Sequence, residues 1–108
     1  MGAFAAPLAA GNLDAWRAWA DEVNGPRRTE FDDMNARHNV TDHRAYLQPT
    51  PDGNYLVVVV HDGPGGDSFM ESAARSDNEF DAWFLGKVAE LHGFDLSAGV
   101  PPAPERVL

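Results

Sequence analysis

The sequence predicts a single α+β domain, and three observations support this fold class. A chain of 108 residues is long enough for one hydrophobic core and too short for two. The segment 55–61 contains four consecutive valines between two turn-rich segments, a pattern typical of a strand buried on both faces. The segments 13–23 and 80–91 repeat apolar residues at three- and four-residue steps, which is typical of helices packed on one side. We therefore expect strands and helices to share one core over 1–108.

Composition excludes several classes of function. The hydrophobic fraction of 44% is that of a folded protein. With 17 acidic residues against 8 basic ones and a net charge of -9, the chain lacks the basic patches that neutralise nucleic acids or anionic membranes. It has no cysteine, which excludes disulfides, thiolate metal sites and cysteine nucleophiles. We expect neither a nucleic-acid partner nor a membrane partner.

The N-terminal segment 3–9 is apolar, but it does not have the pattern of a targeting signal. No basic residue precedes it, and Pro7 interrupts it. No segment approaches the roughly 20 apolar residues that span a bilayer. We therefore expect a cytoplasmic protein.

The first half of the chain predicts a strand followed by two helical pieces. Segment 3–9 predicts the strand, and Asn12 is a candidate N-cap for a helix that ends at 24–26, Asn-Gly-Pro. A second helix is predicted over 27–38, where Asp33 and Arg37 are four residues apart and can pair. The apolar stripes of the two helices are Leu13, Trp16, Ala20 and Val23 in the first, and Phe31 and Met34 in the second.

Segments 43–49 and 55–61 predict a β-hairpin around Asp52-Gly53. A two-residue type I′ turn, which we favour because Asp-Gly is its usual sequence, pairs Arg44 with His61 and Tyr46 with Val59. That register places Arg44, Tyr46 and His61 on one face of the sheet. A three-residue turn shifts the register by one and places His43 beside His61 instead.

The second half of the chain predicts two more helices and a last strand. A short helix is expected over 67–74, with Phe69 pointing inward. Ser76 and Glu79 form a capping-box pattern before the next helix, and Gly93 is placed to end it. The segment 105–108 predicts a short final strand. The core stripe of the longer helix is Phe80, Trp83, Phe84, Val88 and Leu91.

The order strand, helix, strand, strand, helix, strand resembles the ferredoxin-like arrangement βαββαβ. Together with the doubly buried valine strand, it is similar to the dimeric α+β barrel superfamily. The resemblance implies a four-stranded antiparallel sheet with helices on one face and the sheet of a second copy on the other, hence a homodimer. It also implies functions found in that group, which includes cofactor-independent antibiotic-biosynthesis-type monooxygenases, polyketide cyclases and ring isomerases. The expected ligand is a small aromatic or polyketide-like metabolite.

Arg44, Tyr46 and His61 are the candidate catalytic residues. On neighbouring strands they would supply a fixed cation, a phenol and an imidazole that titrates near neutral pH. The resemblance implies that His61 or Tyr46 moves the proton and that Arg44 holds an oxyanion. The competing interpretation places all three in the dimer interface of a non-catalytic binding or accessory protein.

Three aromatic residues, Trp83, Phe80 and Trp16, are the candidate wall of a substrate pocket, with a purely structural place in the core as the alternative.

No metal or cofactor site is predicted. The four histidines do not have the spacings of metal ligands, although haem or metal binding through His61 or His92 is a third interpretation. The segment 63–67 lacks the Gly-Lys-Ser/Thr ending of a phosphate loop, and we expect a plain loop. No Gly-x-Ser-x-Gly elbow is present, which disfavours a serine hydrolase.

Overall fold

The computed structural model describes residues 2–95, 99 and 104–108. Over these residues the fold is α+β, as predicted. A 3₁₀ turn at Gly66–Ser68 precedes the third helix. The elements in chain order are β1 (Gly2–Pro7), α1 (Leu13–Asn24), α2 (Arg28–Arg37), β2 (Asp42–Pro49), β3 (Tyr55–Asp62), α3 (Phe69–Ala74) and α4 (Glu79–His92).

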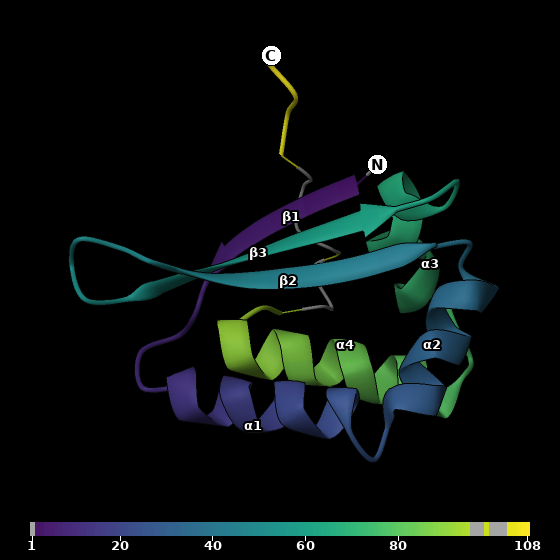
Figure 1. The fold of residues 1–108 in the computed structure, drawn as a ribbon, viewed down its shortest axis with the longest axis horizontal. Helices are drawn as coiled ribbons and strands as arrows, with labels where there is room; N and C mark the ends of the chain where they lie inside the picture. Colours follow the sequence, from purple (N-terminus) through teal and green to yellow (C-terminus); the bar gives the residue numbers. More distant parts are fainter. Residues whose placement is uncertain (1, 96–98, 100–103) are drawn as a thin grey trace.

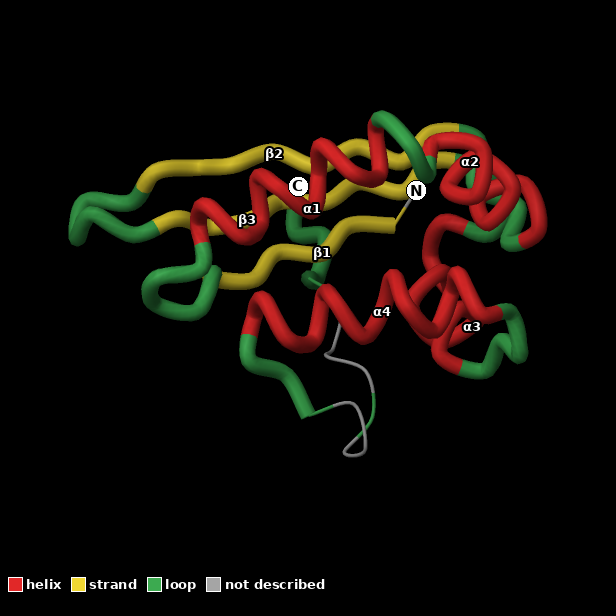
Figure 2. The backbone as a smooth tube through the Cα atoms, turned by 90° about the horizontal axis from the view of Figure 1, so that it is seen from below, coloured by secondary structure: helices red, strands yellow, loops and turns green. Residues whose placement is uncertain are grey.

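The strands form a three-stranded antiparallel sheet in the order β1-β3-β2, with the valine strand β3 in the centre. Helices α1 and α4 lie along one face of this sheet, as predicted, and α2 and α3 pack against α4 at the end of the strands (Figures 1 and 2). The predicted final strand at 105–108 is wrong, because residues 104–108 form neither strand nor helix and are exposed. Val107 and Leu108 are 78% and 103% exposed, so this short segment buries too little apolar surface to hold it against an edge strand.

The hairpin register differs from the one we favoured. His43 pairs with His61, Arg44 with Val60 and Tyr46 with Val58, as the three-residue turn requires. The Gly53 N–H donates to the Thr50 carbonyl at 3.1 Å, and Gly53 has a φ of +84°. The reason is local: Pro51 suits the second position of a type I turn, and the left-handed Gly53 then completes a three-residue loop.

This register decides which side chains face the helices. Because strand residues alternate, a shift of one residue moves every side chain of β2 to the other face. The face toward the helices carries His43, Ala45 and Leu47 beside Val57, Val59 and His61. We call the opposite side the open face; it carries Ala3, Ala5, Arg44, Tyr46, Gln48, Leu56, Val58 and Val60. Val57 is buried on the helix side, whereas Val58 and Val60 on the open face are only half-buried.

The helical stripes form the core as predicted. Phe31 and Met34 of α2 are buried, as are Phe80, Phe84 and Leu91 of α4. Burial of each such side chain contributes about 1.5–3 kcal/mol to folding. Among the described residues the core has a larger cluster between α2, α3 and α4 and a smaller one between α1, β3 and the end of α4. The larger cluster comprises Val23, Phe31, Met34, Val40, Phe69, Ala73, Phe80, Phe84 and Leu85, and the smaller one Leu8, Trp16, Val57 and Leu91.

The N-terminus of α4 differs in detail from the predicted capping box. Asn78, not Ser76, is the N-cap, and its side-chain oxygen accepts hydrogen bonds from the N–H groups of Phe80 (2.9 Å) and Asp81 (3.4 Å). Ser76 instead accepts a hydrogen bond from the Asn78 N–H at 3.2 Å. The later start places Asp81 in the first turn, where negative charge is favoured. Gly93 ends the helix in the left-handed conformation, as predicted.

The glycine-rich loop after β3 packs directly on the main chain. A Cβ atom at Gly66 would lie 2.2 Å from the His61 carbonyl oxygen, and one at Gly65 would lie 1.8 Å from that of His38. These glycines therefore permit close packing around the end of β3, where His61 is located. None of the helices among the described residues has the length and apolar character needed to cross a membrane.

Candidate functional site

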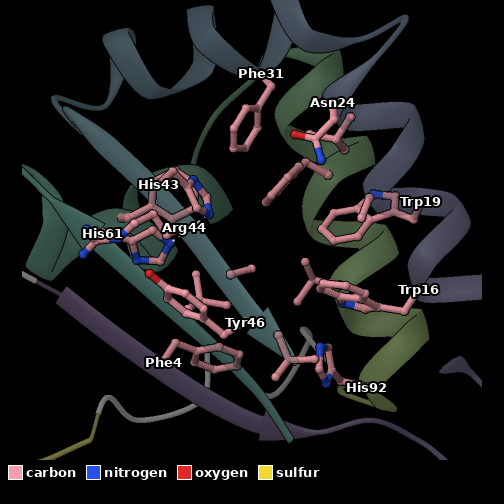
Figure 3. Close-up of a pocket in the computed structure, with 18 of the residues that line it drawn as sticks. Phe4, Trp16, Trp19, Asn24, Phe31, His43, Arg44, Tyr46, His61 and His92 are labelled. Atoms are coloured by element: carbon pink, nitrogen blue, oxygen red, sulfur yellow. Dashed lines mark hydrogen bonds between the residues drawn. The ribbon is translucent and has the colours of Figure 1, made fainter. Parts of the chain in front are cut away.

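A cavity of about 380 Å³ lies between the helix-facing side of the sheet and the helices (Figure 3). Trp16 and Trp19 contribute from α1, opposite His43 and His61 on the sheet. Most of the wall is apolar or aromatic, and a few polar groups converge on it, which is the usual composition of a ligand pocket. The apolar wall includes Phe4, Trp16, Trp19, Ala20, Val23, Phe31, Val57, Val59, Phe69, Met70, Phe84 and Val88, and the polar lining residues include Asn24, Arg28, His43, His61 and His92.

The most unusual polar feature of the cavity is a pair of facing histidines. His43 and His61 are directly paired in the register, and their Nε2 atoms are 3.2 Å apart. The Nδ1 atom of His43 is 2.9 Å from Oδ1 of Asn35 on α2. Aromatic rings enclose the pair: Phe69 lies 4.5 Å from the His61 ring and Phe31 lies 4.9 Å from the His43 ring, between centroids.

Both histidines are neutral at pH 7. Burial lowers the pKa of His43 to about 3, and the neighbouring His61 contributes to this shift in the same direction. Burial also lowers the pKa of His61 to about 4. The pair therefore offers one neutral ring beside another, with hydrogen-bond donors and acceptors and no fixed positive charge. Among the described residues, no group of three or more His, Asp or Glu side chains is arranged to hold a metal ion.

The structure does not bring Arg44 and Tyr46 together with His61. All three border the cavity, but the register directs the side chains of Arg44 and Tyr46 to the open face. The Arg44 guanidinium is 3.2 Å from carboxylate oxygens of both Asp42 and Asp62. Tyr46 is 53% exposed. The sheet therefore separates the predicted cation and phenol from the imidazole.

Only one of the three predicted wall residues borders this cavity. Trp16 lines it and is 7% exposed. Phe80 lies in the larger core cluster, and Trp83 packs against that cluster while its ring lies 4.0 Å from the Arg27 guanidinium carbon. Phe80 and Trp83 thus support the helical layer behind the cavity.

Several residues in or beside the cavity had only weak signals in the sequence. His43 appeared in the alternative hairpin register, and Trp19 as a residue that widened the α1 stripe. Asn35 had no signal, because a single asparagine on a charged helix resembles a solvent-exposed residue; in the structure it is 8% exposed. Among the described residues, Nε1 of Trp19 is the one fully buried side-chain nitrogen or oxygen without a hydrogen-bond partner.

His92 joins the end of α4 to the sheet near the opposite end of the cavity. Its Nδ1–H donates to the Pro7 carbonyl at 2.8 Å. Burial lowers the pKa of His92, although the hydrogen bond to Pro7 opposes this shift. The ring stacks on Phe94 at 5.5 Å and meets the edge of Phe4 at 6.5 Å. His92 therefore fixes the geometry of this end of the cavity.

A Ser-His-Asp arrangement is present elsewhere in the fold, although no hydrolase motif is visible in the sequence. The Ser72 Oγ is 2.6 Å from Nδ1 of His38, and Nε2 of His38 is 2.8 Å from Oδ2 of Asp81. Arg37 binds the same carboxylate through two hydrogen bonds of 2.7 and 2.9 Å. Asp81 is completely buried, and none of these side chains borders the cavity. We interpret the cluster as a structural link between α2, α3 and α4.

Comparison of the chain with protein-family models, with curated proteins and with solved structures finds no match. Its function is therefore inferred from the cavity and the side chains around it.

Proposed function

We propose that this protein binds a small aromatic or polyketide-like metabolite in the cavity between the sheet and the helices. The volume of about 380 Å³ lies within the range of roughly 300–1,000 Å³ that is typical of ligand pockets. The aromatic wall, with Trp16 and Trp19 facing the sheet, suits a flat ring system.

The observation that carries this proposal is the His43–His61 pair, with His61 buried and His43 half-buried, at a mostly apolar cavity. Burying polar groups costs free energy, and titratable groups with strongly shifted pKa values gather at functional sites. His61 is 3% exposed, yet it borders the cavity, so a ligand that enters there meets an imidazole. The pair supplies the orienting polar contact, and the aromatic wall supplies the apolar contact area.

If the protein is an enzyme, its resemblance to the dimeric α+β barrels favours cofactor-independent oxygenation, cyclisation or isomerisation. His61 then accepts a proton from a phenol or an enol of the bound metabolite. The resulting electron-rich anion reacts with molecular oxygen or rearranges. In this proposal Arg44 and Tyr46 have no role at the reacting atoms, because their side chains lie across the sheet.

We also propose that two copies pair through the open face, as in the dimeric α+β barrels. The central strand supports this pairing, since Val58 and Val60 remain half-buried on a face that no described helix covers. The position of Arg44 and Tyr46 on the same face favours the second candidate function, a non-catalytic dimeric binding or accessory protein. Their polar groups then contribute to the interface.

Filling the cavity tests the proposed binding. Ala20 lines the cavity from α1, so Ala20→Phe places a ring in the space that a ligand would occupy. We expect wild-type protein to bind 1-naphthol in isothermal titration calorimetry and Ala20→Phe to bind it at least about tenfold more weakly. Ala18→Phe is the matched control, because Ala18 is exposed on the same helix.

An equal loss of binding in both variants, or no binding by the wild type, contradicts the proposed site. Turnover separates the two candidate functions. Oxidation of 1-naphthol by one O₂ to 1,4-naphthoquinone and water, absent in His61→Ala, supports the enzyme. Binding without oxygen uptake or rearrangement supports the binding protein.

A further inference from the structure

Three polar side chains, two of them buried, form a continuous chain beside the cavity. Asn35 comes from α2, His43 from β2 and His61 from β3. Oδ1 of Asn35 is 2.9 Å from Nδ1 of His43, and Nε2 of His43 is 3.2 Å from Nε2 of His61. Asn35 is 8% exposed and His61 3%, and His43 between them is half-buried.

The order of donors and acceptors in this chain follows from counting protons. Oδ1 of Asn35 can only accept, so Nδ1 of His43 carries the proton. A neutral imidazole has a single N–H, which leaves Nε2 of His43 as an acceptor. The Nε2 of His61 must therefore donate to it. The remaining nitrogen, Nδ1 of His61, then holds a lone pair.

This last nitrogen is the one left for a ligand. Within the described part of the chain, the side chain of His61 forms its hydrogen bond through Nε2. Its Nδ1 forms none there, and it does not belong to the fully buried atoms that lack a partner. His61 borders the cavity, and Nδ1 is the ring nitrogen that His43 does not engage, so we infer that its lone pair is available to a molecule that fills the cavity.

We propose that Asn35 and His43 hold His61 in the Nε2–H tautomer, so that the cavity selects a neutral ligand that donates a hydrogen bond, such as a phenol or an enol. This inference rests on the proposed binding of an aromatic metabolite. His61 is the residue that contacts the ligand, and Asn35 and His43 are positioning residues that act through it.

The same geometry disfavours ligands of other chemistry. A ketone or an ether would place its own lone pair against that of His61 and leave both unpaired in a buried site. A carboxylate would find no cation at the histidine pair. The Arg28 guanidinium, also at the cavity, is already bound to Asp32 at 2.9 Å and is half exposed.

The tautomers can be measured without any ligand. Long-range ¹H–¹⁵N correlation spectra distinguish a protonated ring nitrogen from one that carries a lone pair. At pH 7 we expect His43 to be protonated at Nδ1 and His61 at Nε2. We call the hydrogen-bonded series Asn35–His43–His61 the relay. A spectrum in which His61 is protonated at Nδ1, or at both nitrogens, overturns the proposed relay whether or not the cavity binds a metabolite.

The Asn35→Asp variant reverses the relay. A carboxylate at this position favours the His43 imidazolium, whose Nε2–H donates to His61 and moves the proton of His61 to Nδ1. Wild-type protein is expected to bind 1-naphthol at least about tenfold more tightly than 1-tetralone, a ketone of similar size. In Asn35→Asp we expect that preference to be lost or inverted, with the corresponding change in the ¹⁵N spectrum.

Asn54→Asp is the matched control, because it makes the same change at an exposed residue that neither lines the cavity nor belongs to the relay. We expect it to keep the wild-type preference and tautomers. If Asn35→Asp does not fold, Asn35→Leu removes the acceptor and is expected to mix the two tautomers and reduce the preference.

The outcomes separate this inference from the proposed function. If both probes bind the wild type equally well, the selectivity is overturned while ligand binding in the cavity stands. If neither probe binds but the spectra show the expected tautomers, the relay stands, and the proposed function and the selectivity fail together.

Discussion

At the scale of single residues, Asp81 is a buried carboxylate that binds several partners in the helical layer. Burial by itself raises the pKa of the Asp81 carboxyl, but hydrogen bonds from Arg37, Ser76 and His38 outweigh this effect and hold the pKa below its usual range. The carboxylate is therefore charged, completely buried and bound by groups at the C-terminal end of α2.

We expect Asp81→Asn to lower the free energy of unfolding by about 3–5 kcal/mol, because it leaves the Arg37 guanidinium without its buried counter-ion. Urea denaturation followed by circular dichroism measures this loss. Asp33→Asn is the matched control, since Asp33 binds the same arginine at 2.7 Å but is 61% exposed. It should cost no more than about 0.5 kcal/mol. Equal losses in the two variants would contradict the role assigned to Asp81.

The site residues show what can be foreseen at this scale. His61 was recognisable as a polar residue at the end of an apolar strand, and it does border the cavity. The residue that pairs with His61 could not be recognised in the same way. Arg44 and His43 are neighbours in the chain, and a difference of one residue in the loop decides which of them faces His61. Trp19 reaches the cavity, and Asn35 reaches His43, only because α1 and α2 pack over the sheet.

At the scale of elements, the helices follow from their apolar periodicity, whereas the hairpin depends on its turn. The Thr50 side chain hydrogen-bonds the Asp52 carboxylate, and Asp52 also accepts the Asn54 N–H at 3.2 Å. These contacts stabilise the three-residue loop in which Gly53 is left-handed. The turn thereby determines the pairing of His43 with His61.

Two glycine substitutions test these roles of the turn and the helix. Gly53 has a φ of +84°, where a Cβ atom is strained, so Gly53→Ala should lower the free energy of unfolding by about 1–2 kcal/mol. Gly86 lies within α4, and a Cβ atom there would meet open space, so Gly86→Ala should raise the free energy of unfolding by about 0.5–1 kcal/mol. Thermal unfolding should show shifts of opposite sign. A neutral or stabilising Gly53→Ala would argue against the left-handed turn.

At the scale of the whole molecule, helices cover one face of the sheet, and no helix in the described part of the chain covers the other (Figure 1). We expect wild-type protein to sediment as a dimer at micromolar concentration. Val58→Lys places a charge at the centre of the open face, and burying it without a counter-ion should weaken association at least about a hundredfold. Ala18→Lys, on the exposed side of α1, is the control and should remain dimeric. A monomeric wild type would refute the proposed pairing.

By itself, the sequence determined the α+β class, the three strands, the positions of the helices and the residues that form their buried stripes. These features depend on local periodicity and turn residues, which are written directly along the chain. Only the tertiary structure decided the hairpin register, the absence of a strand at 105–108 and the joining of Asn35, His43 and His61 beside one cavity. Those outcomes depend on contacts between segments far apart in the chain, where one residue of shift reverses a face.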